Sequence, residues 1–238
     1  MMTISDQPRQ PEPINRLRLI LRTGLALLCY VLCLFVPAGT LAWFKGWLFL
    51  FVMVGTIILV SLYLRRVNPE VIAARINRHQ GTKRWDRLLV MVFILPTILA
   101  TLIVAALDDG RYHWLPVPWW VCVLGYALLI IGMVGVTWAE SVNKFFEPTV
   151  RIQTDRGHEV IDNGPYAIVR HPGYVFICIL IVGISLALGS LWALIPAVLS
   201  CLLLVVRTVL EDRMLLTELP GYMDYAQRVR YRLVPGVW

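Results

Sequence analysis

Residues 118–139 read PWWVCVLGYALLIIGMVGVTWA, and none of these 22 residues is charged. A helix needs about 20 predominantly apolar residues to cross the hydrocarbon core of a bilayer. A backbone inside lipid must also satisfy its own hydrogen bonds, which a helix does within one segment. The stretch therefore predicts a transmembrane helix.

The composition of the whole chain agrees with a membrane protein. Of its 238 residues, 58% are hydrophobic and 16% are charged, against roughly 45–50% and about 25% in soluble domains. The mean hydropathy is +0.71. A soluble domain of this size leaves much of its surface in water. The composition therefore excludes an ordinary soluble enzyme, a disordered chain and a disulfide-stapled domain.

Apolar stretches of this kind occur six times along the chain. The first four approach or exceed the length of one bilayer crossing. The last two are shorter and are separated by Gly189-Ser190, which predicts a tight helical hairpin whose second arm continues toward Leu216. The predicted fold is an all-α, polytopic transmembrane helical bundle of about six spans. The six stretches are Leu19–Pro37, Phe44–Leu64, Leu88–Leu107, Pro118–Ala139, Tyr174–Gly189 and Leu191–Val206.

Basic residues fall on alternate ends of these stretches. Of the 22 Lys and Arg residues, only Lys45 and Arg111 lie on one side, and the other 20 lie on the opposite side. Cytoplasmic loops collect such residues. We therefore expect a multi-pass integral membrane protein with both termini in the cytoplasm. The net charge of +7 then reflects topology and attraction to anionic lipid headgroups, and no nucleic acid partner is expected.

Three regions follow from this pattern. Residues 1–18 are mostly polar and contain prolines, which predicts a loose cytoplasmic tail. Residues 19–139 are expected to form four transmembrane helices, with a basic cytoplasmic loop at 65–87. Residues 140–238 contain the polar groups best suited to chemistry and are expected to include the helical hairpin 174–206 and a cytoplasmic tail.

Several local features predict details of the fold. Alternating side chains on both sides of Asp155-Arg156-Gly157 predict a short β-hairpin within residues 150–161. Pro96 and Pro196 lie within apolar stretches and are expected to kink their helices. The five cysteines lie in apolar stretches without the spacing of a zinc site, so no metal is expected. Close helix packing is expected at Gly125, Gly132 and Gly135.

A first group of candidate functional residues precedes the last hairpin. His158 and His171 lie in the same polar segment, and His171 is followed by Pro172 at the expected start of a helix. The first N–H groups of a helix point outward and attract an anionic group. The alternative interpretation is a helix start with a histidine that has no function.

A second group lies where the last apolar stretch leaves the membrane. Arg207 and Glu211 are one helical turn apart and therefore share a face, and Asp212 follows. Ionisable residues at membrane depth tend to face interiors or cavities. The alternative is an interfacial salt bridge. Because both groups fall on the same cytoplasmic boundary, they can jointly form one pocket.

These residues resemble a known family. Gly164-Pro165-Tyr166 and Arg170-His171-Pro172-Gly173-Tyr174 precede the acidic pair, and Gly221-Tyr222, Tyr225 and Arg232-Leu233-Val234-Pro235 follow it. The pattern is similar to that of isoprenylcysteine carboxyl methyltransferases and of the related phospholipid methyltransferases. The resemblance covers roughly residues 140–235. The first two helices are similar only as membrane spans.

The resemblance implies an S-adenosylmethionine pocket at the cytoplasmic membrane face, within a methyltransferase-like region at 140–238. It also implies that Arg207 lies at the acceptor site and acts in catalysis. An upstream polar contact falls on Arg151 by spacing, with Gln153 two residues later, and the choice between them stays open. The cofactor-binding residues implied by the resemblance are His158, Glu159, Val160, Ile161, Tyr166, His171, Pro172, Gly173, Tyr174 and Glu211.

The chemistry of these residues fits a methyl donor and an acceptor carboxylate. Glu211 can pair with a cationic group or a ribose hydroxyl, His171 and nearby N–H groups can hold a carboxylate, and tyrosine ring faces can meet a positive methyl-sulfonium. A carboxylate is already ionised at pH 7 and needs no base, but it needs orientation, which the forked donors of Arg207 can give. An amine or thiol would need deprotonation by Glu211 or Asp212. The expected partners are the lipid bilayer and a hydrophobic or lipid-linked acceptor.

Two other functions have similar sequence signatures. Membrane sterol-type reductases that bind NADPH have a similar boundary motif but usually carry asparagine in place of Gly173. A non-catalytic accessory membrane protein could retain the same fold. The pair of Arg207 and Glu211 favours a methyltransferase, with a carboxyl O-methyltransferase as the most specific form of the prediction.

Overall fold

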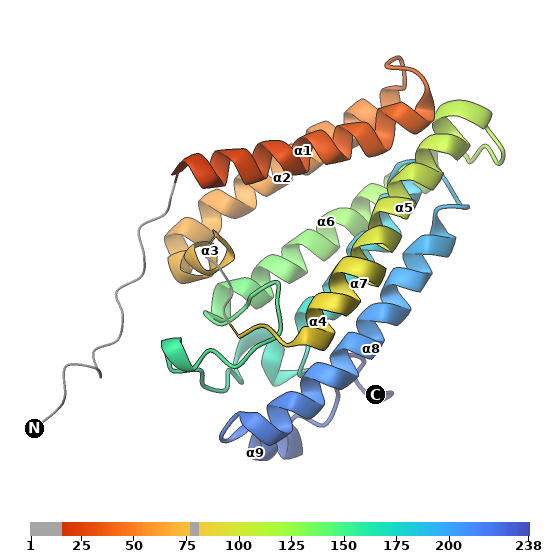
Figure 1. Cartoon of the computed structure of the whole chain (residues 1–238). Coiled ribbons are helices and arrows are strands. Elements are labelled where there is room, and N and C mark those ends of the chain that lie inside the picture. Colours follow the sequence, from red (N-terminus) through yellow and green to blue (C-terminus); the bar gives the residue numbers. More distant parts are fainter. Residues whose placement is uncertain (1–15, 77–80) are drawn as a thin grey trace, which may run out of the picture.

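The computed structural model describes residues 16–76 and 81–238, and within these ranges it contains helices and no β-strand (Figure 1). The all-α prediction is therefore confirmed for this part of the chain. Most of the predicted loose tail, residues 1–18, lies outside the described residues.

The helices follow the apolar stretches closely. Helix α6 covers the stretch from which the fold was predicted, and α8 continues well past its apolar part, as expected. The described part of the loop at 65–87, which is predicted to be cytoplasmic, is partly helical. The α-helices are α1 (Arg16–Ala38), α2 (Phe44–Val67), α3 (Pro69–Ile76), α4 (Arg84–Leu88), α5 (Leu95–Ala105), α6 (Trp119–Val142), α7 (Pro172–Ala187), α8 (Leu194–Glu218) and α9 (Tyr222–Arg228).

Among the described residues, four helices are long and apolar enough to cross a membrane: α2, α6, α8 and the continuous helix Arg84–Tyr112, which contains α4 and α5. The chain is therefore an integral membrane protein. The apolar helices Thr23–Ala38 and Pro172–Ala187 are shorter. Six crossings and the orientation of the termini stay predictions.

Helices α6 and α7 pack closely along most of their length, and glycine makes this possible. A Cβ atom on Gly125 would lie 2.0 Å from the backbone nitrogen of Ala187, and one on Gly132 would lie 2.7 Å from that of Leu180. Neither backbone can yield cheaply, so both positions exclude a side chain. This confirms the expected close-packing role of these glycines and fixes α7, which carries part of the site.

The two prolines inside apolar stretches both lie in the first turn of an α-helix. Pro96 lies in the first turn of α5 and follows a π-helical segment, Leu89–Ile94, whose wider turns replace the α-helical pattern just before it. Pro196 lies in the first turn of α8, where a missing N–H costs no hydrogen bond. The predicted kink in the interior of α8 is therefore wrong.

The predicted β-hairpin within residues 150–161 is also wrong. The turn is present, as a 3₁₀ turn at Thr154–Arg156 that ends at Gly157 with φ of +62°. The flanking residues do not pair as strands, because the carbonyl of Gln153 accepts hydrogen bonds from the backbone N–H groups of Arg156 and His158. Local hydrogen bonds have therefore replaced a strand ladder.

One end of the bundle contains a compact polar network that we call the outer network: Trp43, Lys45, Asp108, Asp109 and Ser190. Asp109 accepts hydrogen bonds from the Trp43 indole at 2.8 Å and from Lys45 at 2.5 Å. Asp108 accepts one from the Ser190 hydroxyl at 2.6 Å. The network ties together the start of α2, the π-helical end Ala106–Tyr112 of the helix that contains α5, and the connection after α7, which lie at the same end in Figure 1.

Candidate active site

A cavity of about 310 Å³ lies among α6, α7, α8 and α9 and the segment between α6 and α7, away from the outer network. This volume is at the lower end of the usual range for small-molecule sites. The two sequence groups meet here, because both His158 and Arg207 line it. Of the predicted site residues, Pro172 is the one that does not line it. Those that do are His158, Glu159, Val160, Ile161, Tyr166, His171, Gly173, Tyr174, Arg207 and Glu211.

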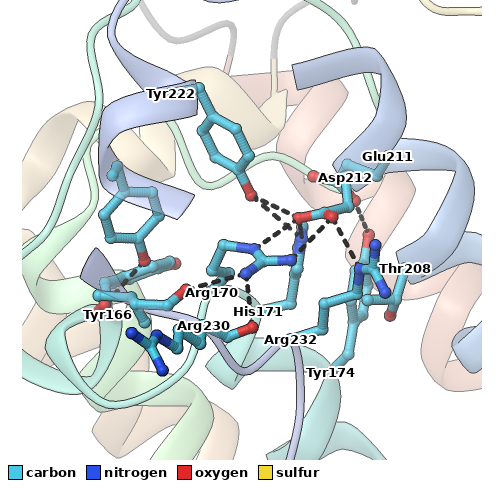
Figure 2. A network of polar contacts seen from close by, with 12 residues as sticks. Tyr166, Arg170, His171, Tyr174, Thr208, Glu211, Asp212, Tyr222, Arg230 and Arg232 are labelled. Atoms are coloured by element: carbon cyan, nitrogen blue, oxygen red, sulfur yellow. Dashed lines mark hydrogen bonds and ion pairs between the residues drawn. The ribbon is translucent and has the colours of Figure 1, made fainter. Parts of the chain in front are cut away.

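Asp212 organises one wall of the cavity without lining it. Its side chain is fully buried and accepts hydrogen bonds from Arg170, Tyr222 and Arg232, as Figure 2 shows. The Nε2 atom of His171 lies 3.2 Å from one of its oxygens. A buried carboxylate is costly unless it is paired and hydrogen-bonded. These partners hold Asp212 as a structural centre, so it is not an available base.

The backbone at the start of α7 is held by a distant part of the chain. The N–H groups of Arg170 and His171 donate to the carbonyls of Tyr231 and Arg232, each at 2.9 Å. The Arg170 guanidinium also donates to the carbonyls of Val229 and Arg230. The backbone N–H of His171 is therefore already paired, and any anion at this helix start would have to use N–H groups that follow it.

Tyr174 and Glu211 are neighbours in the wall of the cavity. The Tyr174 hydroxyl donates a hydrogen bond to the Glu211 carboxylate, and the guanidinium carbon of Arg207 lies 5.4 Å from the centre of the Tyr174 ring. The three side chains form a continuous row of a cation, a ring and an anion. Such a row presents a negative carboxylate and an aromatic face to the same space.

Arg207 forms its ion pair with Asp86 of α4 rather than with Glu211. Its Nε lies 2.7 Å from one Asp86 oxygen and its Nη2 lies 3.2 Å from the other, and Nη2 also donates to the carbonyl of Pro148 at 2.8 Å. Asp86 is fully buried. Sequence reasoning missed this residue. The available signal was a carboxylate at the entry of a transmembrane helix, within a loop of seven basic residues.

His158 is held as a neutral ring at the cavity edge. Its Nδ1 accepts the N–H of Gln153 at 3.3 Å, and the ring packs on Phe145 with a centroid distance of 4.6 Å. Burial lowers the pKa of His158 to about 4. At neutral pH the ring is therefore uncharged, with Nδ1 as an acceptor, which leaves Nε2 as its N–H donor.

The remaining predicted residues differ in how firmly they are held. Tyr166 is buried, accepts a hydrogen bond from Asn143 at 3.0 Å, and has its pKa raised by burial. Glu159 is exposed and pairs with Lys144 at 2.8 Å, which lowers its pKa. Val160 and Ile161 pack against the buried cluster beside Tyr166.

Arg151 and Gln153 both line the cavity and both have internal partners. Arg151 forms a two-point ion pair with the buried Glu147, with both distances 2.9 Å, and a second pair with Asp155. The amide of Gln153 is buried and bonds to the carbonyl of Phe145 and to Arg156. The geometry therefore gives each a role in holding the segment between α6 and α7, and does not choose between them as a ligand contact.

Comparison with known proteins gives the class of the chain. Residues 120–218, which span α6 to α8, match the family model described as phospholipid methyltransferase. The predicted family resemblance is thereby confirmed over residues 120–218. The match contains most of the cavity wall but ends before Tyr222 of α9.

Two curated relatives are similar over a comparable length. Over 136 residues, or 55% of the chain, it is 32% identical to the nickel-cobalt-cadmium resistance protein NccN of Alcaligenes xylosoxydans xylosoxydans. It is 31% identical over 134 residues, again 55% of the chain, to the cobalt-zinc-cadmium resistance protein CzcN of Cupriavidus metallidurans. The matches span 59% and 58% of these proteins, so the chain spans about three fifths of the length of the curated relatives it matches.

Proposed function

We propose that this chain is an S-adenosylmethionine-dependent methyltransferase that methylates a hydrophobic or lipid-linked acceptor at the membrane surface. The observation that carries the proposal is the convergence of two segments, His158–Tyr174 and Arg207–Glu211, on one cavity within a membrane methyltransferase family. Neither segment alone forms an enclosed site.

The residues of the cavity fit such a cofactor chemically. Glu211 offers a carboxylate to a cationic group or a ribose hydroxyl, and Tyr174 and Tyr166 offer ring faces to a positive centre or a flat base. Val160 and Met214 add apolar surface. Bound there, S-adenosylmethionine would supply a methyl group on a positively charged sulfur, open to in-line displacement by the acceptor.

We propose a carboxylate as the acceptor group. Nη1 of Arg207 can hold one carboxylate oxygen and leave the other free to form the new O–CH₃ bond. The C–S bond breaks and its electron pair stays on sulfur, so no proton is released. An amine would need a base, and Asp212 is already held by four side chains. The chain then acts mainly by holding two reactants in line.

The proposal takes no metal-binding role from the names of the two relatives. In the part of the chain that the structure describes, no group of three or more His, Cys, Asp or Glu side chains is arranged to hold a metal ion. The cavity instead contains aromatic rings, arginines and a carboxylate. These groups suit an organic ion.

Calorimetric titration of the full chain in detergent with S-adenosylmethionine tests the cofactor. We expect saturable binding that Glu211→Ala weakens, and no binding of NADPH. Gly173 favours this outcome. A Cβ atom at this position would lie 2.6 Å from the Phe146 ring, so the asparagine that reductases usually carry there would push the ring aside. Binding of NADPH without S-adenosylmethionine would overturn the proposal.

Incubation of membranes that contain the chain with methyl-labelled cofactor tests the acceptor. Base-labile label in a lipid-soluble product is expected for a methyl ester, whereas base-stable label indicates an amine or thioether and refutes the carboxylate. Arg207→Ala is expected to reduce labelling while S-adenosylmethionine still binds. Arg207→Lys should restore labelling only in part, because lysine has no rigid planar group that keeps one nitrogen directed at the acceptor.

A further inference from the structure

Asp86 is a buried carboxylate that lies outside the cavity and contacts two residues that line it, through the side chain of Arg207 and the backbone N–H of Val150. It is fully buried at the start of the helix that contains α4 and α5. One of its oxygens accepts from Nε of Arg207, and the other accepts from Nη2 of Arg207 and from the backbone N–H of Val150 at 2.8 Å. It therefore joins three segments that are distant in the sequence.

The contacts of Arg207 use one edge of its guanidinium group. Nε donates to Asp86, and Nη2 donates to both Asp86 and the carbonyl of Pro148. Within the described ranges, Nη1 is not among these donors. Because a guanidinium is planar and rigid, fixing the edge formed by Nε and Nη2 also fixes the direction of Nη1. Asp86 thus determines how Arg207 faces the cavity.

Stability alone gives a weak reason for this pair. Replacing a buried ion pair with apolar residues of similar volume is often neutral or stabilising, because desolvation offsets much of the attraction. A charged group that must hold a defined direction beside a ligand does need such a partner. The pair lies beside the ring of Tyr174, which is itself bonded to Glu211. Its position is that of an orienting contact at the edge of the cavity.

We propose that Asp86 is a positioning residue, which holds the guanidinium of Arg207 so that Nη1 meets the anionic group of the acceptor. It does not contact the cofactor. The inference rests on the proposed methyl transfer and assigns a role to a residue outside the matched family region, which begins at residue 120. Because Nε and Nη2 are already bonded, only Nη1 of Arg207 is available to the acceptor.

The test measures cofactor affinity, turnover and thermal stability of the full chain with the substitutions Asp86→Asn and Asp86→Glu. Turnover is measured with methyl-labelled S-adenosylmethionine and an S-prenylated N-acetylcysteine in membranes. We expect Asp86→Asn to reduce turnover by roughly 10–100-fold, the range for outer partners that orient metal ligands. The dissociation constant of S-adenosylmethionine should stay within about twofold. Asp86→Glu keeps the charge and should restore turnover in part.

Two comparisons separate positioning from a structural role. Glu218→Gln breaks the exposed ion pair of Lys83, three residues before Asp86, and should leave all three measurements unchanged. In an Arg207→Lys background, Asp86→Asn should cost less turnover than in the wild type, because lysine presents no rigid edge to orient. Additive losses would contradict the proposal.

The remaining outcomes are decisive. Unchanged turnover per folded molecule in Asp86→Asn overturns the inference, as does a parallel loss of turnover and cofactor affinity. If Asp86→Asn does not accumulate, the same criteria apply to Asp86→Glu. If the wild-type chain neither binds S-adenosylmethionine nor transfers label, the proposed function fails and the inference fails with it.

Discussion

Both ends of the helical bundle bury carboxylates, and they do so with different results. At one end, Asp108 and Asp109 accept hydrogen bonds from Ser190, Trp43 and Lys45, and none of these five residues lines the candidate cavity. At the other end, buried carboxylates hold cations and rings that do line it. A buried charge by itself therefore does not indicate a site.

The difference lies in whether the partners of each carboxylate line the cavity. The partners of Asp109 lie at the start of α2, and neither of them borders the cavity. Asp86 and Asp212 hold Arg207, Arg170 and His171, and these three residues border open volume. The cavity end thus has two layers, with carboxylates behind and ligand-facing groups in front. The following four predictions test this contrast, from the largest expected effect to the smallest.

The largest effect is expected at Asp212. Asp212→Asn leaves Arg170 and Arg232 buried or half-buried against a neutral amide, which should cost about 3–5 kcal/mol of stability, as when one partner of a buried pair is removed. Thermal unfolding in detergent measures the loss. Binding of S-adenosylmethionine should be lost as well, because His171 and Tyr222 line the cavity. A stable variant with normal binding would refute the two-layer description.

A smaller effect on stability but a clear effect on binding is expected at Glu211. Glu211→Gln keeps an oxygen for the Tyr174 hydroxyl and removes the charge. The expected loss of cofactor affinity is roughly 10–100-fold, since a hydrogen bond to a charged group is worth about 1.5–3 kcal/mol. Isothermal calorimetry measures the affinity. Unchanged affinity would remove Glu211 from the binding site.

In the outer network, a substitution is expected to lower stability without changing cofactor binding. Asp108→Ala leaves the buried hydroxyl of Ser190 without its carboxylate and should cost about 1–3 kcal/mol. The melting temperature should fall, while the affinity of the folded protein for S-adenosylmethionine stays at the wild-type value. If Asp108→Ala lost affinity for S-adenosylmethionine as Asp212→Asn is expected to, the two ends would not be functionally distinct.

The smallest effect concerns pH. Burial lowers the pKa of His158 to about 4 from an ordinary value of 6.5. The unfolded chain therefore binds this proton below about pH 6.5 and the folded chain only below about pH 4, so acidification across that window reduces stability. His158→Gln should lose less stability between pH 7 and pH 5, as measured by chemical unfolding. Equal losses in both proteins would indicate an ordinary histidine.

Much of the fold could be predicted from the sequence, because lipid restricts a long apolar stretch to a helix. The bounds of α2 and α6 follow the predicted stretches within a few residues. The β-hairpin at residues 150–161 could not be judged correctly, since alternation of side chains is weak support when local hydrogen bonds compete with a strand ladder. The π-helical segment before Pro96 was likewise beyond a pattern that records only hydrophobicity.

The candidate site was predictable where chemistry and position coincide. His171, Tyr174 and Glu211 border one cavity, as their common boundary suggested. The partner of Arg207 was not predictable, because Asp86 is 121 residues away along the chain and helical periodicity pointed to Glu211. Spacing along one helix indicates which residues share a face, but it does not show which residue of another helix occupies that face.

The hydrogen bonds from Arg170 to the carbonyls of Val229 and Arg230 bridge about sixty residues. During synthesis, α7 is therefore translated well before the residues that hold its start. One wall of the cavity is completed by residues that follow α8 in the chain. A chain truncated after α8 would keep the helices that form most of the cavity wall and yet lack the segment that holds the start of α7, so completion of the site depends on residues outside those helices.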